Sequence, residues 1–327
     1  MELIISGYGA KTEDTIKGFI LQEDGTFLER WKDSVENPSF VCQGDGYLFT
    51  VTENGDGAVI YLYGRKRQGY QLLDHKRIEG SALCHITYSP KNKVLFGACY
   101  GTGTLFAVKV ELGRFGDILH QEIQQEGNAL TRVHCVLLNR KEDRLFTVNI
   151  ALDRIFIYAV NQGYLTLERI IKAPEGSGPR HALFSADESY LYVITEYSNE
   201  ILVYDLKDED RLVQQISTLS DRFNGKSYCS TLCFSKNNAY LYAANRGAET
   251  IALFSVGSDG RLSYLEEYDC GGQHPRHMIL SGDGKKLLVC NQNSHQIFCF
   301  MLDTAQGRII GKLGSLDFTS PTGILEV

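Results

Sequence analysis

The sequence predicts an all-β fold, a ring of seven four-stranded antiparallel blades, and three observations lead to it. A leucine that opens an apolar run recurs at intervals of 47, 50, 46, 50 and 46 residues, at Leu48, Leu95, Leu145, Leu191, Leu241 and Leu287. A further apolar run follows ten residues after each of the last five starts, and twelve after the first. No stretch sustains a helical period of 3.6 beyond two turns. This period with four short strands per unit is typical of a β-propeller.

Within one unit the elements follow in a constant order. The unit from Arg180 has a first run "RHALFS", a polar turn "ADES", a second run "LYVITE" and a third run "ILVYDL". The runs are rich in β-branched and aromatic residues, and the turns carry Gly, Asp, Asn and Lys, which predicts strands joined by tight turns. Three of the six prolines precede a first strand, at Pro179, Pro275 and Pro321. There proline removes no hydrogen-bond donor from a strand interior.

The two ends of the chain each hold part of a unit. The lead-in to a first strand occurs seven times, at positions 37, 84, 134, 180, 230, 276 and 320. The seventh lead-in has no second strand after it before Val327, whereas "LIISGYG" and "IKGFILQEDGTF" near the start resemble second and third strands without a first. We therefore expect the C-terminal strand to pair with the N-terminal strands, which leaves no open sheet edge. Residues 1–327 are predicted to form a single domain.

The composition and the absence of certain motifs argue against several classes of protein. The net charge of −7 and the absence of a basic stripe argue against a nucleic-acid partner. No apolar run approaches the ~20 residues of a membrane span, and the N-terminus lacks a secretory pattern. Nine cysteines without a Cys-x-x-Cys pair predict reduced thiols and a cytoplasmic location. Motifs for nucleotide phosphate binding or a serine nucleophile are absent, and no pattern specifies an oligomeric state.

The repeat places two sets of residues at one mouth of the central channel. The first strand of a blade is innermost, and the antiparallel second strand ends where the first begins. Eleven residues before each start lie Asn37, Cys84, His134, Arg180, Ser230 and Arg276. Five residues after each start lie Glu53, Tyr100, Ile150, Glu196, Arg246 and Gln292. One residue earlier lie Thr52, Cys99, Asn149, Thr195, Asn245 and Asn291. Arginine has no place in an apolar core, so these positions indicate either a binding site or a solvated channel.

Three histidines follow the lead-in positions by one residue, at His85, His181 and His277. Strand alternation should turn these side chains away from the residues at the mouth. We expect them to form hydrogen bonds between blades rather than to act in catalysis.

Long phrases in the second half of the chain resemble a known family. They are "VHCVLLNRKEDRLFTVNIALDRIFIY", "GPRHALFSADESYLYVITEYSNEILVY", "LYAANRGAETIALF" and "HPRHMILSGDGKKLLVCNQNSHQIFCFMLDTAQGRI". They resemble the seven-bladed propeller lactonases, which include propeller-type 6-phosphogluconolactonases and fungal carboxy-muconate lactonizing enzymes. The resemblance implies an active site made of His134, Arg180, Glu196 and Arg276. The chain departs from the family's pattern at three positions, with Arg132 in place of a frequent second histidine, and with Asn149 and Ala151.

These residue types suit lactone hydrolysis. A histidine or carboxylate can transfer protons, which assigns this role to His134 or Glu196. Arg180 and Arg276 can bind an anion and stabilise an oxyanion. Further contacts to the substrate are predicted for Asn149, Asn245, Arg246 and Asn291. We expect a small anionic sugar lactone, foremost 6-phosphogluconolactone, as substrate, with no metal and no cofactor.

Three alternatives stay open at this point. A muconate-type lactonizing cycloisomerase would use the same residues in a related reaction. A metal-dependent gluconolactonase could bind Ca²⁺ through oxygen ligands, at Glu196, Asn149, Asn245 and Asn291. Two arginines beside that site would repel a divalent cation. A non-catalytic interaction propeller is the third alternative, although Trp31 is the only tryptophan and the Trp-Asp repeats of one scaffold class are missing.

Overall fold

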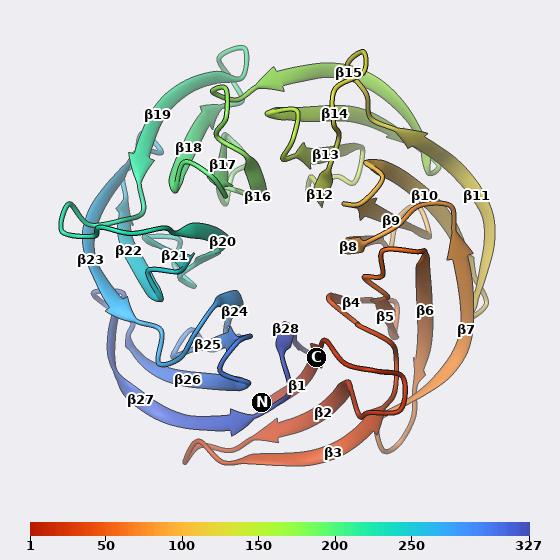
Figure 1. Ribbon diagram of the computed structural model, residues 1–327, viewed down its shortest axis with the longest axis horizontal. Helices are drawn as coiled ribbons and strands as arrows, with labels where there is room; N and C mark the ends of the chain where they lie inside the picture. Colours follow the sequence, from red (N-terminus) through yellow and green to blue (C-terminus); the bar gives the residue numbers. More distant parts are fainter.

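The computed structural model describes all 327 residues. It contains 28 β-strands and no helix. The strands form seven four-stranded antiparallel sheets around a central channel (Figure 1). The first strand of each blade borders the channel and the fourth lies at the rim. The predicted fold class is therefore confirmed. No helix exists that could serve as a membrane span.

Six blades follow the chain order. The first contains β4 (Val41–Gly44), β5 (Tyr47–Val51), β6 (Ala58–Arg65) and β7 (Tyr70–Ile78). The next two contain β8 (Leu83–Ser89), β9 (Val94–Cys99), β10 (Thr104–Glu111), β11 (Arg114–Ile123), β12 (Val133–Leu138), β13 (Arg144–Asn149), β14 (Arg154–Asn161) and β15 (Tyr164–Lys172). The last three contain β16 (Pro179–Phe184), β17 (Tyr190–Thr195), β18 (Glu200–Asp205), β19 (Arg211–Ser217), β20 (Tyr228–Phe234), β21 (Tyr240–Arg246), β22 (Thr250–Val256), β23 (Leu262–Asp269), β24 (Pro275–Leu280), β25 (Lys286–Asn291), β26 (Gln296–Asp303) and β27 (Arg308–Asp317).

The seventh blade joins the two ends of the chain, as predicted. Its strands are β28 (Pro321–Glu326), β1 (Glu2–Gly7), β2 (Ile16–Leu21) and β3 (Phe27–Asp33), in that spatial order. The C-terminal strand β28 is innermost and pairs antiparallel with β1, so that Ile324 lies opposite Ile5. Figure 1 shows the two termini beside each other in this blade. Closing the ring in this way protects the innermost strand edge.

The core is divided into layers between neighbouring blades. On β13, Leu145 packs into the layer shared with the preceding blade, whereas Phe146 and Val148 pack into the layer shared with the following one. Successive residues of a strand point to opposite faces, and both faces of the second and third strands are covered. This explains why these strands appear in the sequence as continuous apolar runs rather than as alternating patterns.

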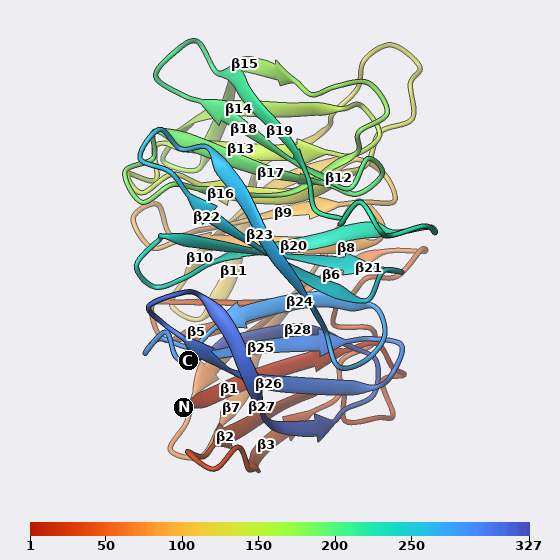
Figure 2. The same ribbon diagram turned by 90° about the vertical axis from the view of Figure 1, so that its left-hand side faces the viewer.

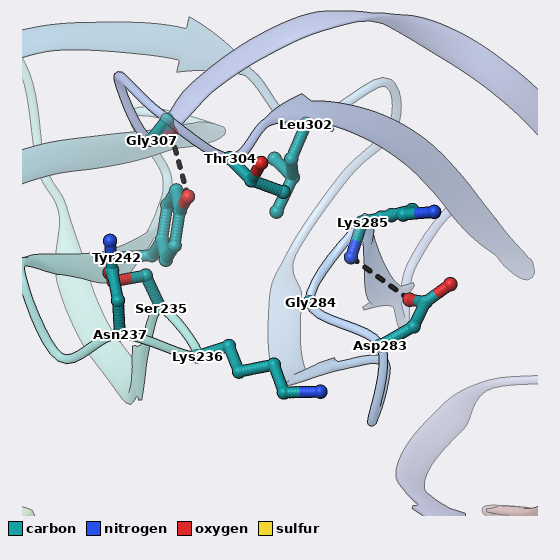
Figure 3. A pocket seen from close by; sticks show the side chains of 10 residues that line it. All are labelled: Ser235, Lys236, Asn237, Tyr242, Asp283, Gly284, Lys285, Leu302, Thr304 and Gly307. Atoms are coloured by element: carbon teal, nitrogen blue, oxygen red, sulfur yellow. Dashed lines mark hydrogen bonds between the residues drawn. The ribbon is translucent and has the colours of Figure 1, made fainter.

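The turns between first and second strands lie on the face opposite the predicted site, because each strand spans the ring's thickness (Figure 2). A surface cavity of about 400 Å³ opens there between the last two chain-order blades (Figure 3). At its edge Lys236 Nζ donates to the carbonyl of Gly282 at 2.6 Å and ties the two blades together. The side chains around it come mostly from turns and include both Lys285 and Asp283, so it has no concentrated charge of one sign.

Candidate functional site

The lead-in residues predicted from the repeat occupy β-bulges. Pro179 pairs with Thr195 and His181 pairs with Ile194, so Arg180 is an extra residue in its strand. The same irregularity recurs in five other blades, at Cys84, His134, Ser230–Thr231, Arg276 and Thr322. A bulge bends the strand and redirects a side chain. Here it brings Arg180 into contact with Glu196, the residue that directly follows the neighbouring second strand.

Arg180 and Arg246 converge on one carboxylate, that of Glu196. Arg180 Nε donates to Glu196 Oε2 at 2.8 Å, and Arg246 Nη2 lies 2.9 Å from the same oxygen. Backbone carbonyls also hold both guanidinium groups. The carbonyl of Ser230 accepts a hydrogen bond from Arg180, and that of Cys229 accepts one from Arg246. Burial alone would raise the pKa of Glu196, but the two arginines hold it below its ordinary value. Burial lowers the pKa of Arg180 to about 10, so Arg180 and Glu196 are both charged at neutral pH.

Arg276 is held by residues from the next two blades around the ring, Tyr8 and Glu53. Its Nη2 donates to the hydroxyl of Tyr8 at 2.6 Å and lies 3.1 Å from Glu53 Oε2, and Tyr8 donates to that same carboxylate oxygen at 2.6 Å. The guanidinium carbon is 5.1 Å from the centroid of the Tyr8 ring, within cation–π range. Burial acts to lower the pKa of Arg276, but Tyr8 and Glu53 raise it overall. Arg276 is therefore a fixed positive charge.

His134 lies beside Tyr100 and His181 as a neutral ring. Its side chain is buried, and its Nδ1 has no hydrogen-bond partner. The rings of Tyr100 and His181 pack against it with centroids at 6.0 and 5.1 Å. Burial, together with the charges of Arg180 and Arg276, holds the pKa of His134 well below its ordinary value. The imidazole is therefore uncharged at neutral pH, and the same surroundings oppose its protonation in the free protein.

Three asparagines predicted to contact substrate are fully buried, at Asn149, Asn245 and Asn291. The side-chain amide of each asparagine forms a hydrogen bond to the loop that precedes the first strand of its blade. Their Nδ2 atoms donate to Thr131 Oγ1 at 2.8 Å, Thr218 O at 2.9 Å and Cys270 O at 2.8 Å, respectively. Without exposed surface, they support the mouth from behind instead of facing a ligand in this structure.

The histidines that follow the lead-in positions form the predicted contacts between blades. Val136 N donates to His85 Nδ1 at 3.4 Å, and Ile324 N donates to His277 Nδ1 at 3.3 Å. In both cases the donor belongs to the first strand of the next blade. These rings therefore act as acceptors that join neighbouring innermost strands.

One expectation about these histidines is wrong. Strand alternation should have turned His181 away from the site, yet its Nε2 lies 3.4 Å from Arg180 Nη1 and its ring packs on His134. The bulge at Arg180 is the reason, because it interrupts the alternation and directs two consecutive side chains towards the channel.

Arginines outnumber glutamates among the paired side chains described here. They are four arginines and two glutamates, namely Arg132, Arg180, Arg246, Arg276, Glu53 and Glu196. Their sum is +2, since 4 − 2 = 2; the carboxylates of Glu249 and Asp153 lie at the same mouth but bind backbone N–H groups, of His274 and Gly178. His274 adds no charge, because burial and the arginines lower its pKa to about 4. This concentration of positive charge suits an anionic ligand.

The side chains do not favour a cation at this mouth. No group of three or more His, Cys, Asp or Glu side chains is placed to hold a metal ion. Glu196, the carboxylate of the predicted calcium alternative, is already paired with two arginines. The asparagine oxygens of that alternative lie in the buried layer behind it.

The sequence prediction missed two residues that form the site, Tyr8 and Glu53. Glu53 occupies the same repeat position as Glu196, five residues after its leucine, but the resemblance to the family does not point to it. Tyr8 becomes visible when the count is extended to the incomplete first unit, because it lies five residues after Leu3. The structure supports this equivalence, since Tyr8 N donates to Ser320 O and Glu196 N donates to the carbonyl of the matching lead-in.

Comparisons with known proteins agree with the geometry. A 6-phosphogluconolactonase of Bacillus subtilis is 26% identical over 287 residues, which cover 84% of this chain and 82% of the relative. A 6-phosphogluconolactonase of Klebsiella pneumoniae is 26% identical over 68% of both chains. The solved periplasmic gluconolactonase PpgL of Pseudomonas aeruginosa superposes with a TM-score of 0.92 at 24% identity, over 99% of this chain and 98% of the other, and so shares the fold. Residues 2–325 match the family described as "Lactonase, 7-bladed beta-propeller", and the chain therefore belongs to this family.

Proposed function

We propose that the protein hydrolyses a small anionic sugar lactone, with 6-phosphogluconolactone as its substrate. The observation that carries the proposal is the convergence of Arg180, Glu196, Arg276 and the neutral His134 at one mouth of the channel. The relatives named as 6-phosphogluconolactonases support the choice of substrate.

The arginines would bind the lactone and stabilise the charge that develops on its carbonyl oxygen. Arg180 donates from Nε to Glu196 and from Nη1 to the carbonyl of Ser230, so its Nη2 has no protein partner. A donor that is held in place before the reaction contributes more than a mobile one, because nothing must reorganise as the oxyanion forms. Glu196 serves this arrangement by fixing Arg180 and Arg246, and its second oxygen, Oε1, makes no salt bridge.

His134 is the better candidate for proton transfer. Its neutral ring can take a proton from the attacking water, whereas Glu196 is occupied by two charged hydrogen bonds that weaken it as a base. Arg180 and Arg276 oppose a positive charge on His134 in the free protein. A bound anion between the arginines offsets their field and makes protonation of His134 easier when substrate is present.

Two further features belong to the proposal. Hydrolysis is metal-independent, because arginine side chains supply the electrophilic groups that a metal would otherwise provide. The location is cytoplasmic, in keeping with nine cysteines that all remain unpaired.

The test is a hydrolysis assay of purified protein on 6-phosphogluconolactone, with and without a chelator. We expect turnover that the chelator leaves unchanged and that Arg276→Lys lowers strongly, because lysine cannot reproduce a planar fork held by Tyr8 and Glu53. No turnover above the spontaneous rate would refute the proposed activity. Turnover that the chelator abolishes would refute its metal-independent mechanism.

A further inference from the structure

We propose that Arg132 forms a second anion subsite at the mouth, which binds the phosphate group of a phosphorylated lactone and sets the substrate's charge preference. This inference rests on the proposed function and extends it to the recognition of the non-reacting end of the substrate.

Arg132 is the one arginine of the mouth without a carboxylate partner. Arg180 and Arg246 share Glu196, and Arg276 pairs with Glu53. The only hydrogen bond of the Arg132 guanidinium goes from Nη1 to the hydroxyl of Tyr100, at 2.6 Å. Four of its five N–H groups therefore remain available, and its charge is not compensated by the protein.

The position of Arg132 is fixed before any ligand binds. Its backbone N donates to Asn149 Oδ1 at 3.1 Å, and its carbonyl accepts from Ile150 N at 2.9 Å. Its guanidinium carbon lies 4.8 Å from the centroid of the Tyr100 ring. Less conformational freedom is then lost on binding than for a mobile surface arginine. The buried Asn149 thus shapes this subsite from behind.

Tyr197 connects the subsite to the paired arginines. It directly follows Glu196 and is 43% exposed, and its ring packs over Gly178, where an added Cβ would lie 2.5 Å from it. Burial raises the pKa of the Tyr197 phenol, Tyr100 and Glu196 raise it further, and Arg132 opposes the rise. Tyr100, which holds Arg132, also packs its ring against that of His134 with the centroids 6.0 Å apart, so the subsite lies next to the reacting end.

This arrangement fits a ligand with two separate polar ends. A phosphate monoester carries about −1.5 to −2 charges at pH 7 and matches the planar fork of arginine. With the phosphate on Arg132, the lactone ring would extend past Tyr197 towards Arg180 and His134. An unphosphorylated lactone would lose only the contact to Arg132, because the groups around the carbonyl stay the same.

The experiment compares Arg132→Gln with Arg144→Gln on two substrates. Arg144 begins β13 in the same blade, at the opposite face, where its Nε pairs with Glu168 at 2.9 Å. For Arg132→Gln we expect KM for 6-phosphogluconolactone to rise roughly 10- to 100-fold, the range for a lost hydrogen bond to a charged group. Its kcat and its kinetics on unphosphorylated gluconolactone should match the parent, as should Arg144→Gln on both substrates.

Equal losses on both lactones, or no change on either, would overturn the subsite. If the parent protein hydrolyses neither lactone, the proposed function fails, and calorimetric titration with inorganic phosphate then decides the subsite alone. Binding that Arg132→Gln removes and Arg144→Gln keeps supports the subsite. Absence of phosphate binding in the parent, or binding that Arg132→Gln leaves unchanged, overturns it.

Discussion

Arg180 Nε lies 2.8 Å from Glu196 Oε2, although the two residues come from opposite strands of a hairpin and are 16 positions apart. Only 3% of the Arg180 side chain and 18% of the Glu196 side chain are exposed. A buried charge needs a partner, and this pair supplies one while keeping a guanidinium at the channel mouth. Glu196 therefore contributes both to the stability of the fold and to the proposed chemistry, because the same carboxylate also pairs with Arg246.

Glu196→Gln should destabilise the fold. It leaves Arg180 and Arg246 buried without a counter-charge, for which we expect a loss of about 3–5 kcal/mol in the free energy of unfolding. Urea denaturation measures this change. Glu168→Gln is the matched control, since its exposed pair with Arg144 should contribute at most about 1 kcal/mol. Equal effects of the two substitutions would contradict the structural role of Glu196.

Arg180→Lys should not preserve activity. Lysine keeps a charge but cannot bond Glu196 and Ser230 O at once and still point a donor at the mouth. We expect kcat/KM on the true substrate to fall about 10²- to 10³-fold, as for the loss of an oxyanion-binding donor. Steady-state kinetics with a circular-dichroism check of folding test this. Parental kinetics in the folded variant would remove Arg180 from the proposed mechanism.

His134→Gln should lower kcat by roughly 10²- to 10⁴-fold, the usual contribution of a positioned acid or base. His181→Asn provides the comparison: its ring packs on His134 and also contacts Thr231 of the next blade, so we expect a smaller loss of turnover together with a lower melting temperature. Kinetics and thermal unfolding are measured on both variants. If His181→Asn loses as much turnover as His134→Gln at unchanged stability, proton transfer has been assigned to the wrong ring.

Mild acid should destabilise the ring through its channel histidines. Burial lowers the pKa of His85 to about 3 and that of His277 to about 4, below the ~6.5 of an unfolded chain. Below about pH 6.5 the unfolded chain binds protons that the folded chain does not, so stability falls as the pH drops towards 4. We expect a loss of about 2 kcal/mol for each ring at about pH 5, because the imidazole of the unfolded chain is then almost fully protonated and that of the folded chain is not.

His85→Asn tests this pH dependence, since its amide oxygen can still accept from Val136 N but cannot titrate. The free energy of unfolding, measured by urea denaturation between about pH 7.5 and about pH 5, should change less with pH than in the parent. An identical slope in both proteins would show that His85 does not contribute.

Removal of the last eight residues, Ser320–Val327, should destabilise the whole ring. The deletion takes away β28, the innermost strand of its blade, and exposes the edge of β1 to pairing with other chains. We expect a large fall in melting temperature and aggregation, measured by calorimetry and light scattering. An unchanged melting temperature would argue against closure by this strand.

The repeat in the sequence determined the architecture, because every blade must bury two faces of the same strands against its neighbours. The constant spacing from Leu48 to Leu287 therefore predicted seven blades, the pairing of the chain ends and a common mouth for His134, Arg180, Glu196 and Arg276. The same count, extended to Leu3, also points to Tyr8.

Tertiary structure alone decided how these residues act. The bulges at the lead-in positions override strand alternation, so Arg180 and His181 face the channel together. Contacts across the ring decide which arginine is neutralised: Arg276 meets Tyr8, 268 positions away in the sequence, while Arg132 meets only a phenol. Spacing identifies a ring position, but the charge and freedom of a side chain depend on neighbours that folding brings from other blades.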